Sequence, residues 1–182
     1  VHGQDLSHIA KHLGLTNREI LFSTQKIPLS AMSTFYNIAD VTVNISDAEG
    51  FGLSTLESLA CGTPIIATVT GGLQEQIIGE GGPFGIPLFP VSKSIIGSQE
   101  VPYIYEDRIS KNHFFSALSN MYDMGAEERH RLGELGRQHV LKNYNFENFE
   151  KQWVEFMMRV HKESGSWETR KNYSNITFKE VA

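Results

Sequence analysis

The order of hydrophobic and polar residues in the first half of the chain predicts short strands that alternate with helices. Residues 41–45 alternate between apolar and polar side chains, and residues 65–68 form a short apolar run, as buried strands do. Between them, residues 53–61 carry leucines at helical spacing, and Gly62 and Pro64 end the predicted helix. The local order is therefore strand, turn, helix, strand.

The same reading extends along the whole chain. Helices are predicted at residues 6–13, 30–38, 53–61, 73–78, 111–124, 126–143 and 146–161. Strands are predicted at residues 20–22, 41–45 and 65–68, whereas 79–85 forms a glycine-rich loop and 87–105 is irregular, with at most one strand at 103–105. Alternating strands and helices predict an α/β fold, a Rossmann-like doubly wound parallel sheet with helices on both faces.

Three regions are expected. Residues 1–145 form the sheet domain, whose first strand–helix unit is expected to lie upstream, since residues 1–3 resemble the end of a strand. Residues 146–164 form a closing helix with an apolar stripe that is expected to pack on more protein, because such a face is unfavourable in water. Residues 165–182 are expected to form a flexible or extended polar tail.

Composition narrows the class of protein. The 182 residues suffice for one domain, and 40% hydrophobic with 20% charged residues is typical of a globular protein. The net charge of −5 gives no electrostatic case for binding nucleic acid. No apolar run approaches the roughly 18 residues that a membrane span requires. A single cysteine, Cys61, rules out an internal disulfide and favours a cytoplasmic location.

The most informative segment is the turn between the strand at 41–45 and the helix at 53–61. Open α/β sheets bind ligands at the carboxyl ends of their strands, and a helix N-terminus there favours anions. Glu49 precedes the turn and Glu57 follows it by eight positions. Carboxylates and phosphates repel each other. They can share a site if the carboxylates accept hydrogen bonds from sugar hydroxyls while backbone N–H groups bind the phosphates. The alternative is an ordinary glycine turn with two solvated glutamates.

The residues of this region resemble a known family. The segments Glu49-Gly50-Phe51-Gly52-Leu53, Leu56-Glu57, Ala60-Cys61-Gly62-Thr63-Pro64-Ile65-Ile66-Ala67 and Gly71-Gly72 are similar to those of the retaining GT-B glycosyltransferases with paired glutamates, the group 1 type. The resemblance implies the C-terminal, donor-binding half of a GT-B fold. It also implies that an N-terminal domain, absent from this chain, binds the acceptor.

The family's site residues carry over position by position. The implied substrate-binding residues are Glu49, Gly50, Phe51, Gly52, Leu53, Ser54, Glu57 and Lys26. The resemblance implies that Glu49 is the catalytic residue and contacts the transferred sugar, that residues 50–54 hold sugar hydroxyls and the diphosphate, and that Glu57 binds the ribose. Lys26 lies where the family's loop meets the base, and a solvated loop lysine is the alternative there.

The resemblance also implies the chemistry. A hexosyl group would pass from a nucleoside diphosphate sugar, a UDP- or GDP-sugar, to an acceptor with its anomeric configuration retained, without a metal or another cofactor. The chain alone is expected to transfer nothing, since the acceptor domain and a basic pair facing the diphosphate are missing. An epimerase or phosphorylase on the same fold, or a non-catalytic nucleotide-sugar-binding module, are the alternatives. The segment 85–107 is longer than the corresponding segment of the family. It is expected to be either surface decoration or a family-specific loop near the cleft.

Overall fold

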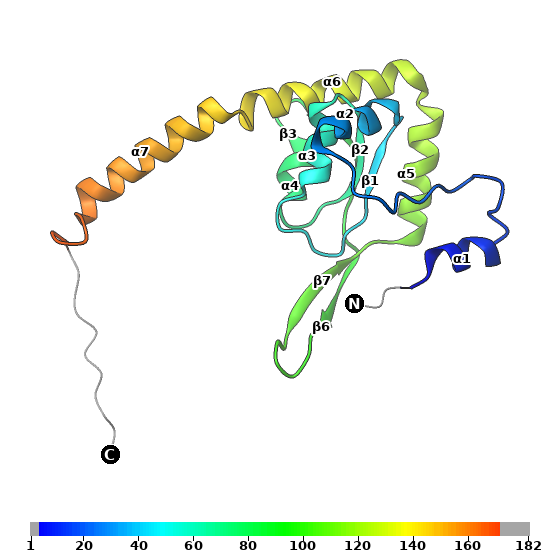
Figure 1. Cartoon of the computed structure of the whole chain (residues 1–182), viewed down its shortest axis with the longest axis horizontal. Helices are drawn as coiled ribbons and strands as arrows, with labels where there is room; N and C mark the ends of the chain where they lie inside the picture. Colours follow the sequence, from blue (N-terminus) through cyan, green and yellow to red (C-terminus); the bar gives the residue numbers. More distant parts are fainter. Residues whose placement is uncertain (1–3, 172–182) are drawn as a thin grey trace.

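The centre of the molecule is a three-stranded parallel sheet (Figure 1). The computed structural model describes residues 4–171. The sheet runs in the order β1 (Thr42–Asn44), β2 (Ile65–Thr68), β5 (Gly85–Leu88). All four residues of β2 are buried, because a strand pairs along each of its edges and helices cover both of its faces. The predicted α/β class and the predicted parallel sheet are confirmed.

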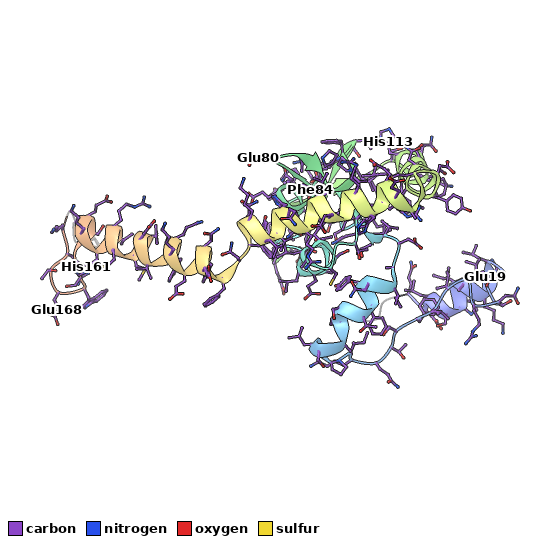
Figure 2. The ribbon with its side chains drawn as sticks, turned by 90° about the horizontal axis from the view of Figure 1, so that it is seen from above. Glu19, Glu80, Phe84, His113, His161 and Glu168 are labelled. Atoms are coloured by element: carbon purple, nitrogen blue, oxygen red, sulfur yellow. The ribbon has the colours of Figure 1, made fainter. Side chains whose placement is uncertain are left out.

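Successive side chains of β2 point into two separate cores, as strand geometry requires. Ile65 and Ala67 pack against one set of helices, and Ile66 packs against the other. The helices that form these two layers are α3 (Leu53–Ala60), α4 (Leu73–Ile77) and α6 (Gly125–Asn143) on the first face and α5 (Lys111–Asp123) on the second. In the view from above, Phe84 of the first core lies against α6 (Figure 2).

The remaining elements lie outside this core. They are α1 (Leu6–His12), α2 (Leu29–Ile38), the short pair β3 (Ile78–Gly79) and β4 (Gly82–Pro83), the hairpin β6 (Ser92–Ile96) and β7 (Ile104–Arg108), and α7 (Phe146–Ser164). The predicted helices all form, and no end shifts by more than three residues. Within residues 4–171, no helix combines the length and apolar character that crossing a membrane requires.

The strand predicted at residues 20–22 is wrong. These residues form no strand, and Leu21 is 79% exposed. An apolar run becomes a strand only where a neighbouring strand pairs with it, and no described strand lies beside this one.

The third strand of the sheet, β5, lies where a glycine-rich loop and an irregular segment are predicted. β5 begins at Gly85, where a Cβ would lie 1.8 Å from the carbonyl oxygen of Ile65, so the close strand approach requires glycine. Proline has no backbone N–H to donate to a neighbouring strand. Pro87 is tolerated because β5 is an edge strand that pairs with β2 along one side only. The glycine and the prolines are typical of a loop, and they concealed this strand.

The segment predicted as irregular also contains the antiparallel hairpin of β6 and β7, in which Ser92 pairs with Arg108 and Ile96 pairs with Ile104. The hairpin follows β5 and projects from the carboxyl edge of the sheet (Figure 1). It therefore lies on the same edge of the sheet as the turn after β1.

Helix α7 continues from the end of α6 and projects away from the sheet (Figure 1). It has no buried residue, and the rings of Phe149 and Trp153 stack in parallel on its surface. After α7 the chain makes a turn in which the N–H of Lys171 donates to the carbonyl of Ser164 at 2.7 Å. No helix or strand forms over residues 165–171, and the flexible or extended polar tail expected there stays a prediction. The rest of that predicted tail, 172–182, and the predicted strand end at 1–3 lie outside the described residues.

Candidate functional site

The turn after β1 leads directly into α3 through a glycine in the left-handed conformation. Gly52, the residue before α3, has φ of +87°, and no side chain caps the helix start. A Cβ on Gly52 would lie 2.4 Å from the Cδ2 atom of Leu73. The first N–H groups of α3 therefore lack a side-chain partner and carry the positive end of the helix dipole, which favours an anion.

A buried polar pair, Thr55 and Gln76, holds the backbone of the turn from the side of the core. The hydroxyl of Thr55 lies 2.8 Å from the carbonyl oxygen of Gly52 and 2.5 Å from Oε1 of Gln76. The side-chain amide of Gln76 donates to the carbonyl of Phe51. Thr55 and Gln76 are both fully buried, so this network fixes the backbone of the turn against the core.

This pair was not predicted from the sequence. The available signal was Gln76 itself, a polar residue on the apolar face of α4 beside Leu73 and Ile77. A buried polar residue requires a hydrogen-bond partner, and here that partner is the site turn.

A second glycine turn, after β2, packs against the first one backbone to backbone. The N–H of Gly72 donates to the carbonyl of Glu49 at 3.2 Å. Gly71 has φ of +46°, and a Cβ there would lie 1.8 Å from the carbonyl oxygen of Glu49. The Gly71-Gly72 part of the motif is thus placed beside the Glu49 part.

The structure leaves Glu49 free to bind a ligand. Its side chain is half-buried, and its carboxylate makes no hydrogen bond or ion pair with any residue in 4–171. Gly50, Leu53 and Ser54 are exposed along the same turn. These accessible residues lie on the turn that follows β1 and on the first turn of α3.

Glu57 lies one helical turn further into α3 and is half-buried. Its Oε2 atom accepts a hydrogen bond of 2.8 Å from the hydroxyl of Tyr36 in α2. Burial and then the neighbouring Glu57 raise the pKa of Tyr36 to about 12. Burial, followed by the charge of Glu57, also raises the pKa of the half-buried Cys61 at the end of α3. Sequence reasoning gave no indication of the Tyr36 contact.

The side chain of Phe51 faces the junction of α6 and α7. Its ring meets that of Tyr144 edge to face, with centroids 6.1 Å apart. Together with Phe146 and Phe149 it lines a hollow of 480 Å³. The backbone of Phe51 therefore belongs to the turn, whereas its ring connects the turn to the start of α7.

Lys26 is not brought to the turn by any contact. Its side chain is exposed and makes no hydrogen bond or ion pair with another described residue. Its assignment to the base remains a prediction.

The hairpin of β6 and β7 is attached to the loop that precedes Glu49. The N–H of Asp107 donates to the carbonyl of Asp47 at 2.9 Å, and Arg108 forms ion pairs with Asp47 and, at 2.8 Å, with Glu106. The long segment after β5 is therefore in direct contact with the site loop.

Residues 4–171 were also searched for side chains that could together bind a metal ion. In this part of the chain no group of three or more histidine, cysteine, aspartate or glutamate side chains is arranged to hold a metal ion.

Comparison with known proteins gives a consistent result. Residues 3–83 match the family model described as glycosyl transferases group 1. A D-inositol 3-phosphate glycosyltransferase from Corynebacterium urealyticum is 32% identical over 150 residues, covering 82% of this chain and 30% of that protein. Another from Streptosporangium roseum is 39% identical over 72 residues, covering 40% of this chain and 16% of that protein.

Two solved structures share the fold. Sucrose-phosphate synthase from Thermosynechococcus elongatus matches with a TM-score of 0.67 and 25% identity, covering 86% of this chain and 34% of that one. The C-terminal domain of a group 1 glycosyl transferase from Francisella tularensis matches with a TM-score of 0.56 and 22% identity, over 78% of this chain and 62% of that one.

The fold thus defines the class: the chain has the fold of GT-B glycosyltransferase domains. Its resemblance to the glycosyl transferases group 1 family is confirmed by the family model and by the relatives. The chain spans less than a third of the length of these two curated relatives.

Proposed function

We propose that this chain is the donor-binding part of a retaining glycosyltransferase that takes a nucleoside diphosphate sugar, with UDP or GDP as its nucleotide. The observation that carries the proposal is the rigid Glu49–Gly52 turn, which leads into the uncapped start of α3 at the carboxyl edge of a parallel sheet. A diphosphate fits the N–H groups and the dipole of α3. The group 1 relatives, whose names state glycosyl transfer, support the same class of reaction.

In this proposal the two glutamates bind different parts of the donor. Glu49, with an unpartnered carboxylate before the turn, accepts hydrogen bonds from the hydroxyls of the transferred hexose and orients it. Glu57, further along α3, accepts them from the ribose. Leu53 and Ser54 stand at the helix start against the diphosphate. Negative charge that develops on the leaving diphosphate is stabilised by helix N–H groups aimed at it before the reaction begins.

The test of the proposed function is an analysis of products. Full-length protein with a UDP- or GDP-hexose and a panel of acceptors should release the nucleoside diphosphate and form a glycoside of the same anomeric configuration, which NMR reports. An epimerase would convert the donor without any acceptor, and a phosphorylase would require free phosphate. A non-catalytic module would bind the nucleotide and release nothing. The 182-residue chain alone should bind the donor and give no product.

Replacing Glu57 with alanine should weaken binding of the nucleoside diphosphate by about 1.5–3 kcal/mol, the value of hydrogen bonds to a charged group. Isothermal titration calorimetry on the full-length protein measures this change. Glu127→Ala, in an exposed residue on α6, is the control and should leave the affinity unchanged. Equal affinities for wild type and Glu57→Ala would remove Glu57 from the site.

Sugar transfer should proceed unchanged in the presence of a chelator. The prediction rests on the helix start and backbone N–H groups as the stabilisers of the diphosphate, and on the lack of a metal-binding cluster within residues 4–171. Initial rates with and without EDTA, before and after adding manganese or magnesium, measure it. Activity that disappears with the chelator and returns with either ion would contradict metal-independent transfer.

A further inference from the structure

We propose that Tyr36 is a positioning residue that holds Glu57 in the orientation in which it receives the ribose hydroxyls of the donor. The inference rests on the proposed function, because it needs Glu57 at the ribose. Tyr36 comes from α2, an element to which neither the motif nor the proposed function assigns a role.

The contact leaves Glu57 able to bind a ligand. The Tyr36 hydroxyl donates to Oε2 of Glu57 at 2.8 Å, and this is the single hydrogen bond of the Glu57 carboxylate within residues 4–171. A carboxylate offers about four lone-pair sites. One is used by the tyrosine, so Oε1 and the second lone pair of Oε2 remain for two neighbouring hydroxyls. The 2′- and 3′-hydroxyls of a ribose are such a pair.

Tyr36 is itself held in place from the other side. Its backbone carbonyl accepts a hydrogen bond of 2.8 Å from the hydroxyl of Thr63, which is buried just before β2. The carbonyl of Thr63 in turn accepts from the hydroxyl of the fully buried Ser58, in α3, at 3.0 Å. The tyrosine is thus tied to the core through its backbone and reaches Glu57 through its side chain.

Core packing does not account for this arrangement. No residue of α2 is buried, and Leu29 and Ile38 at its two ends are 82% and 75% exposed. The helix contacts α3 through a polar bond to the one carboxylate that the proposal assigns to ribose. That bond is also constant over the working pH range, since the pKa of Tyr36 is raised to about 12 and its hydroxyl stays protonated.

The experiment compares Tyr36→Phe with wild type in the full-length protein. Dissociation constants are measured for UDP and GDP and for their 2′,3′-dideoxy counterparts. Loss of one neutral-donor hydrogen bond predicts about 3- to 10-fold weaker binding of the ribonucleotide that the wild type prefers. The dideoxy nucleotide should change less than about 2-fold, because it offers Glu57 no hydroxyls. Tyr122→Phe on α5, whose side chain is 83% exposed, is the matched control and should change neither.

The outcomes separate this inference from the proposed function. In a Glu57→Ala background, Tyr36→Phe should have no further effect on ribonucleotide binding. Equal loss for ribo- and dideoxynucleotides would mean a merely structural role, and tighter ribonucleotide binding would mean that Tyr36 competes with the ribose; either result overturns the inference, as does no change. If Glu57→Ala itself leaves nucleotide affinity unaltered, Glu57 does not bind the ribose and the inference is overturned with that assignment, whereas the analysis of products decides the proposed function separately.

Discussion

Replacing Glu49 with glutamine should lower the turnover of the full-length enzyme by about 100-fold while leaving its affinity for the free nucleoside diphosphate within about 2-fold. Misplacing a reacting group by about 1 Å costs this much in rate, and an amide changes the hydrogen bonds that orient the hexose. The nucleotide does not contact Glu49 in this proposal, so its binding should persist. Steady-state kinetics with a nucleotide sugar and calorimetry with the nucleoside diphosphate provide the two numbers.

The comparison needs a glutamate that is outside the site. Glu127→Gln, in the exposed first turn of α6, should change neither quantity. If turnover and nucleotide affinity both fell by the same factor in Glu49→Gln, Glu49 would be a general binding residue, and its assignment to the transferred sugar would be wrong.

The second large effect is expected from alanine at Gly71. Its φ of +46° is unfavourable for a residue with a Cβ, and that Cβ would lie 1.8 Å from the carbonyl oxygen of Glu49. The obstacle is backbone, so the turn that carries Glu49 has to move. The free energy of unfolding should fall by about 3 kcal/mol, from left-handed strain plus overpacking, and donor binding should be lost with it. Chemical denaturation and calorimetry measure both.

Gly62→Ala is the matched control. Gly62 also has positive φ, +78°, but nothing lies within 4 Å of a Cβ built there. It should lose only the roughly 1–2 kcal/mol of left-handed strain and keep nucleotide affinity. Equal losses of stability in the two variants would show that contact between the two glycine turns contributes little.

Much of the sheet domain could be predicted from local patterns. The run at 65–68 predicted β2, and the leucines after Gly52 predicted α3, because burial and helix periodicity are written into neighbouring residues. Turn residues indicated where this helix ends: Gly62 and Pro64 lie just after the last residue of α3. The strand–turn–helix order placed Glu49 and Gly52 at one sheet edge, as the topology of parallel strands requires.

Other elements depended on pairing that no local pattern reveals. Residues 20–22 look like a strand but have no partner in the described structure, whereas β5 looks like a loop but pairs along β2. β7 overlaps the strand considered at 103–105, whereas its partner β6 was hidden by a glycine and two prolines in a segment of mixed polarity. In each case the outcome was decided by whether another strand lay beside the segment.

The sequence by itself determined the chemical types at the candidate site: two glutamates around a glycine turn, at the end of one strand and the start of one helix. Those features are encoded within about ten consecutive residues, where spacing fixes geometry. Tertiary structure alone decided what holds them. Gln76 reaches the turn from α4, and Tyr36 reaches Glu57 from α2. The carbonyl of Asp47 accepts a hydrogen bond from the N–H of Asp107 in the hairpin. Such contacts join residues more than 20 positions apart, so their existence depends on how the helices pack on the sheet.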